Sequence, residues 1–333
     1  MFFVPGALVI PSEVEGSPGL TGNLEDYPEG IVIPVDKPYR WTSADIIRKL
    51  KWRAIRHFGK KNLKVGHAGT LDPLATGVLL VCIGPACRRA QELQDHDKEY
   101  IARIRFGATT PSYDLEKDVD RRFPYEHITA DAVRAALPAF LGEQEQVAPL
   151  FSAKSVDGVR AYELARKLYK AHQAGSVIPS GVEESLFDSA ALDTLQRNRI
   201  VISELELLDF HDAEETLSPE SSLRDPSHAP CSSSTGCGPL PLTGPRVVTD
   251  SGERVSSASS RINVADTSAL GLPEAVIRIV CSKGTYIRAF ARDLGEALGS
   301  GAHLSGLIRS RSGDFRVEDA LSLDQALELF EQA

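Results

Sequence analysis

A short segment leading into an apolar stretch holds the carboxyl group best placed for chemistry. It runs Gly66-His67-Ala68-Gly69-Thr70-Leu71-Asp72-Pro73-Leu74-Ala75-Thr76-Gly77. The glycines permit close approach of the backbone, and Pro73 restricts the residue before it, the carboxylate Asp72, which lies among apolar neighbours. We therefore expect Asp72 to be presented on a rigid loop. An ordinary Asp-Pro turn is the alternative interpretation.

A second segment offers a cation for that carboxylate. Cys281-Ser282-Lys283-Gly284-Thr285-Tyr286-Ile287-Arg288 follows an apolar stretch, and we expect Tyr286 and Arg288 in the first turn of a helix. An arginine there could form an ion pair with a carboxylate from another loop, which would keep Asp72 ionised and oriented. A glycine turn that binds phosphate and a plain piece of core are the alternatives.

A third segment, Asp97-Lys98-Glu99-Tyr100, places an aromatic ring at the start of an alternating stretch. The ring of Tyr100 could form a platform on which a base stacks. An aromatic residue in this position is more often part of the core. The segment by itself does not decide between these roles.

Hydrophobic periodicity predicts the elements that must hold these segments. The predicted strands cover residues 30–35, 78–83, 100–106, 199–208 and 275–281. A first helix is predicted to be capped by Ser43, and its apolar stripe comprises Ile47, Leu50, Ala54 and Phe58. A second helix begins at Thr129 with a kink at Pro138, and a last one is capped by Ser322 with Gln325 three positions later. The irregular strand spacing predicts an α+β fold.

The composition restricts the class of protein. Hydrophobic residues make up 42% of the 333 positions and charged residues 25%, as in soluble globular proteins. No apolar run approaches the ~18 residues of a membrane-spanning helix. The first basic residue is Lys37, so the start lacks the charged region of a secretory signal. Five cysteines without a C-x-x-C pair argue against disulfides and a zinc site, and we expect a cytoplasmic protein.

Three segments differ from the rest of the chain. Residues 9–17 recur at 177–185 with seven matches in nine, but without the short, fixed spacing of a solenoid repeat. Residues 213–272 are rich in Ser, Pro and Gly and contain no aromatic residue, so they cannot bury enough apolar surface to offset chain entropy. We predict a flexible extension at 1–27 and one domain at 28–333, interrupted by low-complexity insertions at 174–197 and 213–272.

The net charge of −9 conceals a basic block. Residues 37–105 hold 15 Lys or Arg and 6 Asp or Glu, whereas the three unusual segments are acidic. Sequence-independent affinity for nucleic acid comes largely from Lys and Arg side chains at phosphates. The block is therefore a candidate surface for a polyanion. The alternative is a solvated helix face.

The segments at 66–77 and 283–288 together resemble the TruB family of tRNA pseudouridine synthases, which isomerise the uridine at position 55 of the TΨC arm. Shorter matches follow in the family's order: Val35-Asp36-Lys37-Pro38, Thr42-Ser43, Asp97-Lys98-Glu99-Tyr100, Thr109-Thr110-Pro111-Ser112-Tyr113-Asp114, Ser152-Ala153, Gly158, Tyr162-Glu163-Leu164-Ala165-Arg166 and Gly301-Ala302-His303-Leu304. The resemblance implies that residues 28–333 are a catalytic domain with a mixed, mainly antiparallel central sheet flanked by helices.

The resemblance also implies a chemistry. The glycosidic N1–C1′ bond breaks, the uracil turns, and the ring is rejoined through C5, without redox change, metal or cofactor. Asp72 matches the catalytic aspartate and would be the nucleophile, with Arg288 as its partner. Tyr100 matches the pocket tyrosine, whose roles could be stacking on the flipped base or accepting a proton.

Further residues would bind the substrate. Tyr286 and Leu307 would line the uracil pocket, and His67 would lie where the displaced loop nucleotide is held. Lys64, Arg88 and the adjacent Arg89 would contact phosphates of the TΨC stem-loop, because the basic block surrounds the Asp72 segment. The implied partner is tRNA, and we expect a monomer with no membrane association.

Several positions depart from the family pattern. Arg40 stands where the family usually has Gly, which would alter that turn. Ser155 replaces a frequent Lys, which puts an RNA contact in doubt, and Phe151 replaces a common Tyr. Only one predicted helix follows Phe315, so we expect a form without the C-terminal PUA domain, an RNA-binding module of many relatives.

Three other functions fit these residues less well. A tRNA-folding chaperone would need phosphate and stacking contacts but no buried ionised acid, so Asp72, Tyr100 and Arg288 favour catalysis. An RNA-guided synthase is less favoured without a PUA domain. A glycoside hydrolase would need a second carboxylate, and the motif around Asp72 offers none.

Overall fold

The computed structural model describes residues 8–10, 20–149, 155–156, 159–160, 197–213, 262 and 264–331. Most of the predicted extension 1–27 and of the insertions 174–197 and 213–272 lies outside the described residues. So do the family matches at 152–153, 158 and 162–166, and the substitution at Phe151.

Fourteen strands and nine helices are described in these ranges. The strands are β1 (Leu8–Val9), β2 (Ile31–Lys37), β3 (Val65–His67), β4 (Ala75–Ile83), β5 (Lys98–Phe106), β6 (Ala108–Thr109), β7 (Arg121–Arg122), β8 (Gly142–Val147), β9 (Ser155–Val156), β10 (Val159–Arg160), β11 (Arg197–His211), β12 (Glu274–Cys281), β13 (Ala302–Ser312) and β14 (Phe315–Arg316). The α-helices are α1 (Ser43–His57), α2 (Ala90–Asp95), α3 (Ala130–Ala136), α7 (Ile287–Ala297) and α8 (Leu323–Glu328), and the 3-10 helices are η1 (Leu24–Asp26), η2 (Gly84–Arg89), η3 (Leu137–Phe140) and η5 (Ser268–Leu270).

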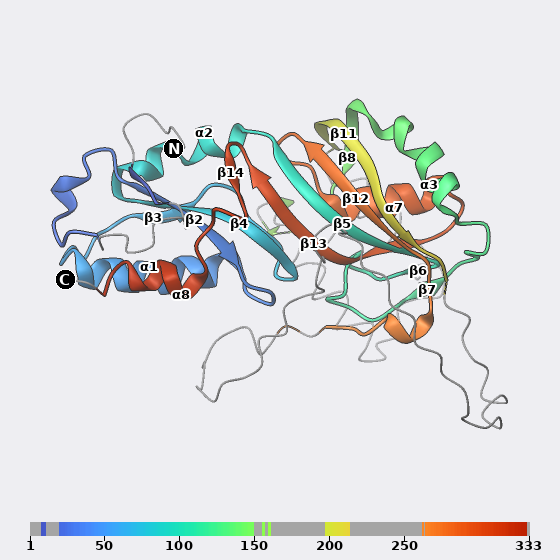
Figure 1. Cartoon of the computed structure of the whole chain (residues 1–333), viewed down its shortest axis with the longest axis horizontal. Coiled ribbons are helices and arrows are strands. Elements are labelled where there is room, and N and C mark those ends of the chain that lie inside the picture. Colours follow the sequence, from blue (N-terminus) through green and yellow to red (C-terminus); the bar gives the residue numbers. More distant parts are fainter. Residues whose placement is uncertain are drawn as a thin grey trace, which may run out of the picture.

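A ten-stranded sheet organises the molecule, with the order β1-β2-β4-β13-β5-β12-β11-β8 and with β3 on β4 and β14 on β13. The β1–β2 and β4–β13 pairs are parallel, and the other pairs in this sheet are antiparallel. Helices α1 and α8 lie side by side next to β2 and β3, whereas α7 packs on β13 and β5 (Figure 1). The predicted α+β fold with a mixed, mainly antiparallel sheet is confirmed.

The central strands follow their hydrophobic patterns. Every residue from Val78 to Ile83 in β4 is buried, as expected for a continuously apolar strand. Strand β5 alternates buried and partly exposed positions over its whole length, as predicted for 100–106. Strand β13 was not predicted. Serines, arginines and Gly306 interrupt its alternation, and its register against β5 shifts at two places.

Two predicted helix ends need correction. Helix α1 is capped by Thr42, not by Ser43: Thr42 accepts the backbone N–H of Asp45, and Asp45 accepts that of Thr42. The hydroxyl of Ser43 is engaged by another loop. After Thr129 the α-helix ends at Ala136, and a 3-10 helix that contains Pro138 continues the chain. The cap at Ser322 with Gln325 is confirmed.

The end of the predicted insertion 213–272 is described from residue 264 onward. Ala265 is buried and donates its backbone N–H to the carbonyl of Leu115, and the hydroxyl of Thr267 accepts a hydrogen bond from Arg105. Residues 264–272 therefore pack against the domain. In the described part of the chain, no helix is long and apolar enough to cross a membrane.

Candidate active site

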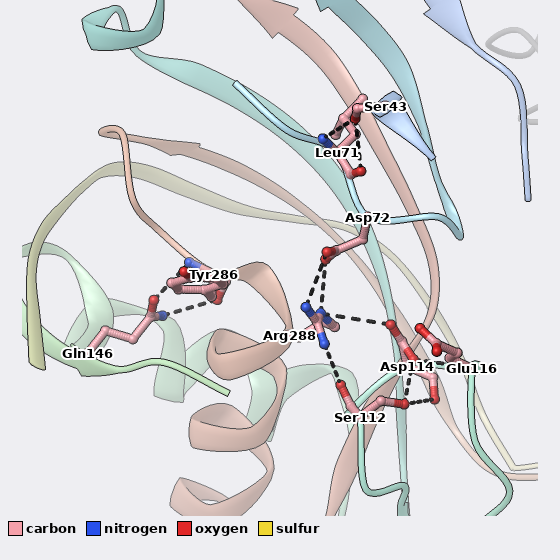
Figure 2. Close-up of polar contacts among 9 residues, drawn as sticks. All are labelled: Ser43, Leu71, Asp72, Ser112, Asp114, Glu116, Gln146, Tyr286 and Arg288. Atoms are coloured by element: carbon pink, nitrogen blue, oxygen red, sulfur yellow. Dashed lines mark hydrogen bonds and ion pairs between the residues drawn. The ribbon is translucent and has the colours of Figure 1, made fainter. Parts of the chain in front are cut away.

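The loop that carries Asp72 joins β3 to β4 and is fixed by α1. The Ser43 hydroxyl accepts the backbone N–H of Leu71 at 2.9 Å and donates to the carbonyl of Leu71 at 3.1 Å (Figure 2). On the other side of Asp72, the Pro73 carbonyl accepts hydrogen bonds from the Lys37 amine at 3.1 Å and the Arg40 backbone at 3.0 Å. The carboxylate therefore sits on a rigid loop, as predicted.

A buried guanidinium lies beneath the same loop. Arg309 on β13 is 1% exposed and donates to the carbonyls of Gly69, Thr70 and Val78. The two strands approach so closely that a Cβ at Gly77 would lie 2.2 Å from the Arg309 carbonyl oxygen, and the φ of Gly77 is +96°. Glycine is required at this position because any side chain would separate β4 from β13.

Asp72 and Arg288 form the predicted ion pair. The Arg288 Nε donates to Asp72 Oδ2 at 2.9 Å, and Nη2 donates to Oδ1 at 3.1 Å. Burial alone would lower the pKa of Arg288, but the charges of Asp72 and Asp114 outweigh it and raise this pKa. The Arg288 side chain is 6% exposed, whereas the Asp72 side chain is 38% exposed. The carboxylate is thus oriented from its buried side and remains accessible from the other.

A second carboxylate shares the guanidinium (Figure 2). Asp114 Oδ2 lies 3.8 Å from Arg288 Nε, and Asp114 Oδ1 accepts hydrogen bonds from the Ser112 hydroxyl and the Glu116 backbone N–H. Burial raises the pKa of Asp114 to about 6, although Arg288 and Ser112 counteract it. The motif around Asp72 gave no sign of this second acid. Both acids therefore interact with the same guanidinium.

The pair opens into a cavity that is partly open to solvent. Its lining comprises Tyr39, Asp72, Leu74, Ala75, Asp114, Leu115, Arg288, Leu304, Ser305, Gly306 and Leu307. Leu307, predicted for the uracil pocket, is part of this lining. Tyr39 is the aromatic residue of this lining, while Tyr100 and Tyr286 are absent from it.

The two tyrosines predicted for the uracil pocket are not part of this lining and make other contacts. Tyr100 is 9% exposed on β5 and makes a hydrogen bond with Arg309. Burial raises the pKa of Tyr100, with Arg309 opposing the shift. Tyr286 is the N-cap of α7 and precedes its first turn, and its backbone N–H donates to the Gln146 side chain at 2.8 Å. The Tyr286 backbone therefore links α7 to β8. The Asp72 carboxylate also contributes to the raised pKa of Tyr100.

The predicted RNA-contacting residues lie around β3. His67 ends β3, its Nδ1 is buried without a hydrogen-bond partner, and burial lowers its pKa, with Arg309 adding to the effect. Lys64 and Arg88 are exposed, and the Lys64 carbonyl accepts the backbone N–H of Gly84, the first residue of the 3-10 helix that contains Arg88. Arg89 pairs with Glu92 at 2.9 Å. The predicted RNA-contacting residues thus lie on β3, directly before it, or on η2, which contacts β3.

The sequence reasoning assigned no role to four residues of the site. Lys37 is fully buried, and burial lowers its pKa to about 7, partly offset by Asp72. Lys37 and Asp114 both lie in segments that resemble the family, which is a sequence signal for these two residues. Arg309 and Tyr39 gave no comparable signal. Among the described residues, no three His, Cys, Asp or Glu side chains cluster as a metal site.

Arg40 occupies a backbone conformation that favours glycine. Its φ is +64°, which explains why a glycine suits this turn better. Two contacts hold the arginine: its backbone N–H donates to the Pro73 carbonyl, and its Nη2 donates to the Ile262 carbonyl at 2.7 Å. The turn is therefore retained despite the substitution. Only the backbone of Ser155, in β9, is described.

Comparisons with known proteins show which family the chain belongs to. Residues 56–177 match the family model described as the N-terminal domain of the TruB family pseudouridylate synthases. A tRNA pseudouridine synthase B from Phocaeicola vulgatus is 41% identical over 307 residues, covering 92% of this chain and 96% of the relative. One from Thermus thermophilus is 36% identical over 289 residues, covering 87% of this chain and 75% of the relative.

A more distant likeness concerns the fold. The crystal structure of a Cbf5-Nop10-Gar1 complex contains a chain that superposes with a TM-score of 0.50 at 20% sequence identity. The match covers 95% of this chain but only 60% of that chain. At this identity the likeness supports the architecture of the sheet and its helices and nothing beyond it.

Proposed function

The chain belongs to the TruB family of pseudouridylate synthases, and from this premise we propose that it isomerises uridine 55 in the TΨC loop of tRNA. The observation that carries the proposal is the bidentate Asp72–Arg288 pair, whose carboxylate is accessible from the cavity. A protein that only binds tRNA has no need of an ionised acid held in this way.

In this proposal Asp72 acts as the nucleophile that assists cleavage of the N1–C1′ bond. Arg288 holds both carboxylate oxygens, which keeps the acid ionised and aimed at the sugar. The freed uracil turns within the pocket and is rejoined through C5. The C5 proton is lost and N1 gains one, so the reaction is an isomerisation without oxidant, reductant or group donor.

The target nucleotide must leave its stack to reach Asp72, because the carboxylate lies inside a cavity rather than on a convex surface. Bases of RNA loops can be everted at low cost. Leu307 and Tyr39 offer apolar walls for the everted uracil. His67 would occupy the space of the displaced neighbour, with Lys64 and Arg88 on the flanking phosphates.

The electrostatics of Tyr100 bear on which group accepts the proton. Its raised pKa keeps the hydroxyl protonated at neutral pH, which weighs against proton acceptance by this group. We propose that Tyr100 supports the uracil from beneath the pocket. Tyr286 would fix the start of α7 and thereby help to position Arg288, two residues further along the chain.

We further propose that the protein acts as a monomer in the cytoplasm and needs no cofactor. A purified protein would be incubated with transcribed tRNA labelled with tritium at C5 of uridine. We expect about one equivalent of tritium released per tRNA, and none from a matched transcript with cytidine at position 55. Release from both transcripts would contradict the assigned position, and release from neither would contradict the proposed function.

A further inference from the structure

Helix α1 presents a basic stripe to solvent on the side opposite its buried face. Ile46, Leu50 and Ala54 are buried. The exposed positions of the helix are Ala44, Arg48, Lys51, Trp52 and Arg56. They follow the three- and four-residue spacing of one helix face. We call Lys51, Trp52 and Arg56 the outer face of α1.

Trp52 is the most exposed large hydrophobic residue in the described chain, at 53%. The guanidinium carbon of Arg56 lies 4.6 Å from the centre of its ring, and that of Arg53 lies 5.4 Å away. Such cation–π contacts preorganise the ring and the positive charges on one surface. A single exposed apolar residue needs no explanation, but an exposed indole between two guanidinium groups is a recurrent feature of nucleic-acid-binding surfaces.

The cations of the outer face are not neutralised by acids. Many arginines elsewhere in the described chain are ion-paired, for example Arg278 with Glu99, Glu204 and Glu206. No described carboxylate forms a salt bridge with Lys51 or Arg56, and the same holds for Lys60 and Lys61 just beyond the helix. The outer face therefore carries net positive charge, which is complementary to a phosphate backbone.

The outer face is rigidly connected to the reaction centre. The first residue of α1, Ser43, binds the backbone of Leu71, the neighbour of Asp72. From Ser43 to Arg56 the helix advances by ~20 Å at 1.5 Å per residue. Figure 1 shows α1 extending away from the β4–β13 junction, where the Asp72 loop lies. A stem leaving the pocket in this direction would follow the helix.

We propose that the outer face of α1 is a second RNA-binding surface, which holds the sugar–phosphate backbone of the substrate outside the target loop. Lys51 and Arg56 neutralise phosphates, and Trp52 packs against a ribose between them. The proposal rests on the proposed function for the identity of the RNA. In this proposal the outer face increases the affinity for the RNA, whereas the chemistry takes place at Asp72.

Fluorescence gives a direct test, since the chain has only two tryptophans, Trp41 and Trp52. In the Trp41→Phe variant, all tryptophan fluorescence comes from Trp52. We expect its emission to change in proportion to bound tRNA and to saturate. An emission that stays constant while filter binding shows a saturated complex would overturn the proposal, because it would place Trp52 outside the interface.

Charge removal gives the second test. We expect Lys51→Ala/Arg56→Ala to weaken tRNA binding about 10-fold near 0.1 M salt and to reduce the slope of log K against log salt by ~2, with kcat at saturating tRNA within about twofold. The control with the same change in net charge is Arg134→Ala/Arg199→Ala. These exposed arginines pair with acids and lie on α3 and β11 at the other end of the molecule (Figure 1). Equal effects of both variants would overturn the proposal.

The two proposals can fail separately. A wild-type protein that releases no tritium from tRNA, but whose tRNA affinity depends on Lys51 and Arg56, contradicts the proposed function and supports the RNA-binding surface. Normal tritium release with unchanged affinity in the double variant contradicts the surface alone. A stem-loop with its stem shortened should lose the difference between wild type and variant, because the RNA no longer reaches the outer face.

Discussion

Two partly buried charge clusters in this molecule combine carboxylates and guanidinium groups in opposite ratios. At the cavity, one guanidinium, Arg288, serves two carboxylates, Asp72 and Asp114. On β12, one carboxylate, Glu274, serves two guanidinium groups, Arg103 and Arg105, and also accepts the Ser305 hydroxyl. The first cluster has an excess of negative charge, and the second has an excess of positive charge.

The ratio of carboxylates to guanidinium groups determines whether a carboxylate stays available to a substrate. The Glu274 oxygens are covered by donors, and the side chain is 5% exposed. Burial alone would raise the pKa of Glu274, but the Ser305 hydrogen bond and the two arginines lower it. At the cavity, burial instead raises the pKa of Asp114, and Asp72 keeps one side accessible. The saturated cluster joins strands, whereas the unsaturated one can act on a substrate.

The largest effect is expected from Asp72→Asn, which removes the accessible charge of the first cluster. Product formation should fall below detection, a loss on the order of 1,000-fold or more, because an amide cannot serve as the nucleophile. Affinity for tRNA should change little. Tritium release and filter binding measure the two quantities. Turnover retained in this variant would remove Asp72 as nucleophile.

The next effect is expected from Arg288→Lys, which keeps the charge but cannot bind both carboxylate oxygens in the same geometry. We expect kcat to fall on the order of 100-fold, with KM for tRNA within a few-fold, because Asp72 loses its orientation rather than its contact with RNA. Steady-state tritium release separates the two constants. An increase in KM with an unchanged kcat would show that Arg288 binds RNA instead.

Glu274→Gln should affect stability more than catalysis. The amide leaves two guanidinium groups beside a neutral side chain, and we expect the free energy of unfolding to fall by ~2 kcal/mol. Activity of the folded variant should remain within about threefold. Urea denaturation and tritium release test the two statements. A folded variant of wild-type stability that has lost turnover would contradict the contrast between the clusters.

The smallest effect concerns the pH dependence of stability, and the two clusters should contribute to it with opposite signs. The pKa of Asp114 is raised from 3.8 to about 6, so the folded protein holds a proton in this range that the unfolded chain has lost. This contribution decreases stability as pH rises from about 4 to about 6. The pKa of Glu274 is lowered from 4.5, so its contribution is present above 4.5 and is lost as pH falls.

Urea denaturation at a series of pH values therefore sharpens the comparison. Relative to wild type, Asp114→Asn should lack the decrease in stability on going from pH 4 to pH 6, and Glu274→Gln should lack a decrease on going below pH 4.5. Parallel pH profiles in both variants would contradict the opposite electrostatics of the two clusters.

Much of the site could be predicted because its residues lie in recognisable segments. The pairing of Asp72 with Arg288 followed from their residue types and from the family resemblance, although 216 positions separate them. The position of Tyr100 relative to the cavity did not follow. Its face of β5 is set by the register against β13, and that strand was not recognised because polar residues and two register shifts break its alternation.

By itself, the sequence determined what depends on neighbours in the chain: the buried run of β4, the alternation of β5, the cap at Ser322 and the motif that contains Asp72. The tertiary structure alone decided that Asp114 shares Arg288, that Arg309 lies beneath the loop, and that Tyr39 rather than Tyr286 reaches the cavity. The reason is physical. Local propensities act between residues a few positions apart, whereas the charge environment of a buried group is set by strands and loops that only the packed sheet brings together.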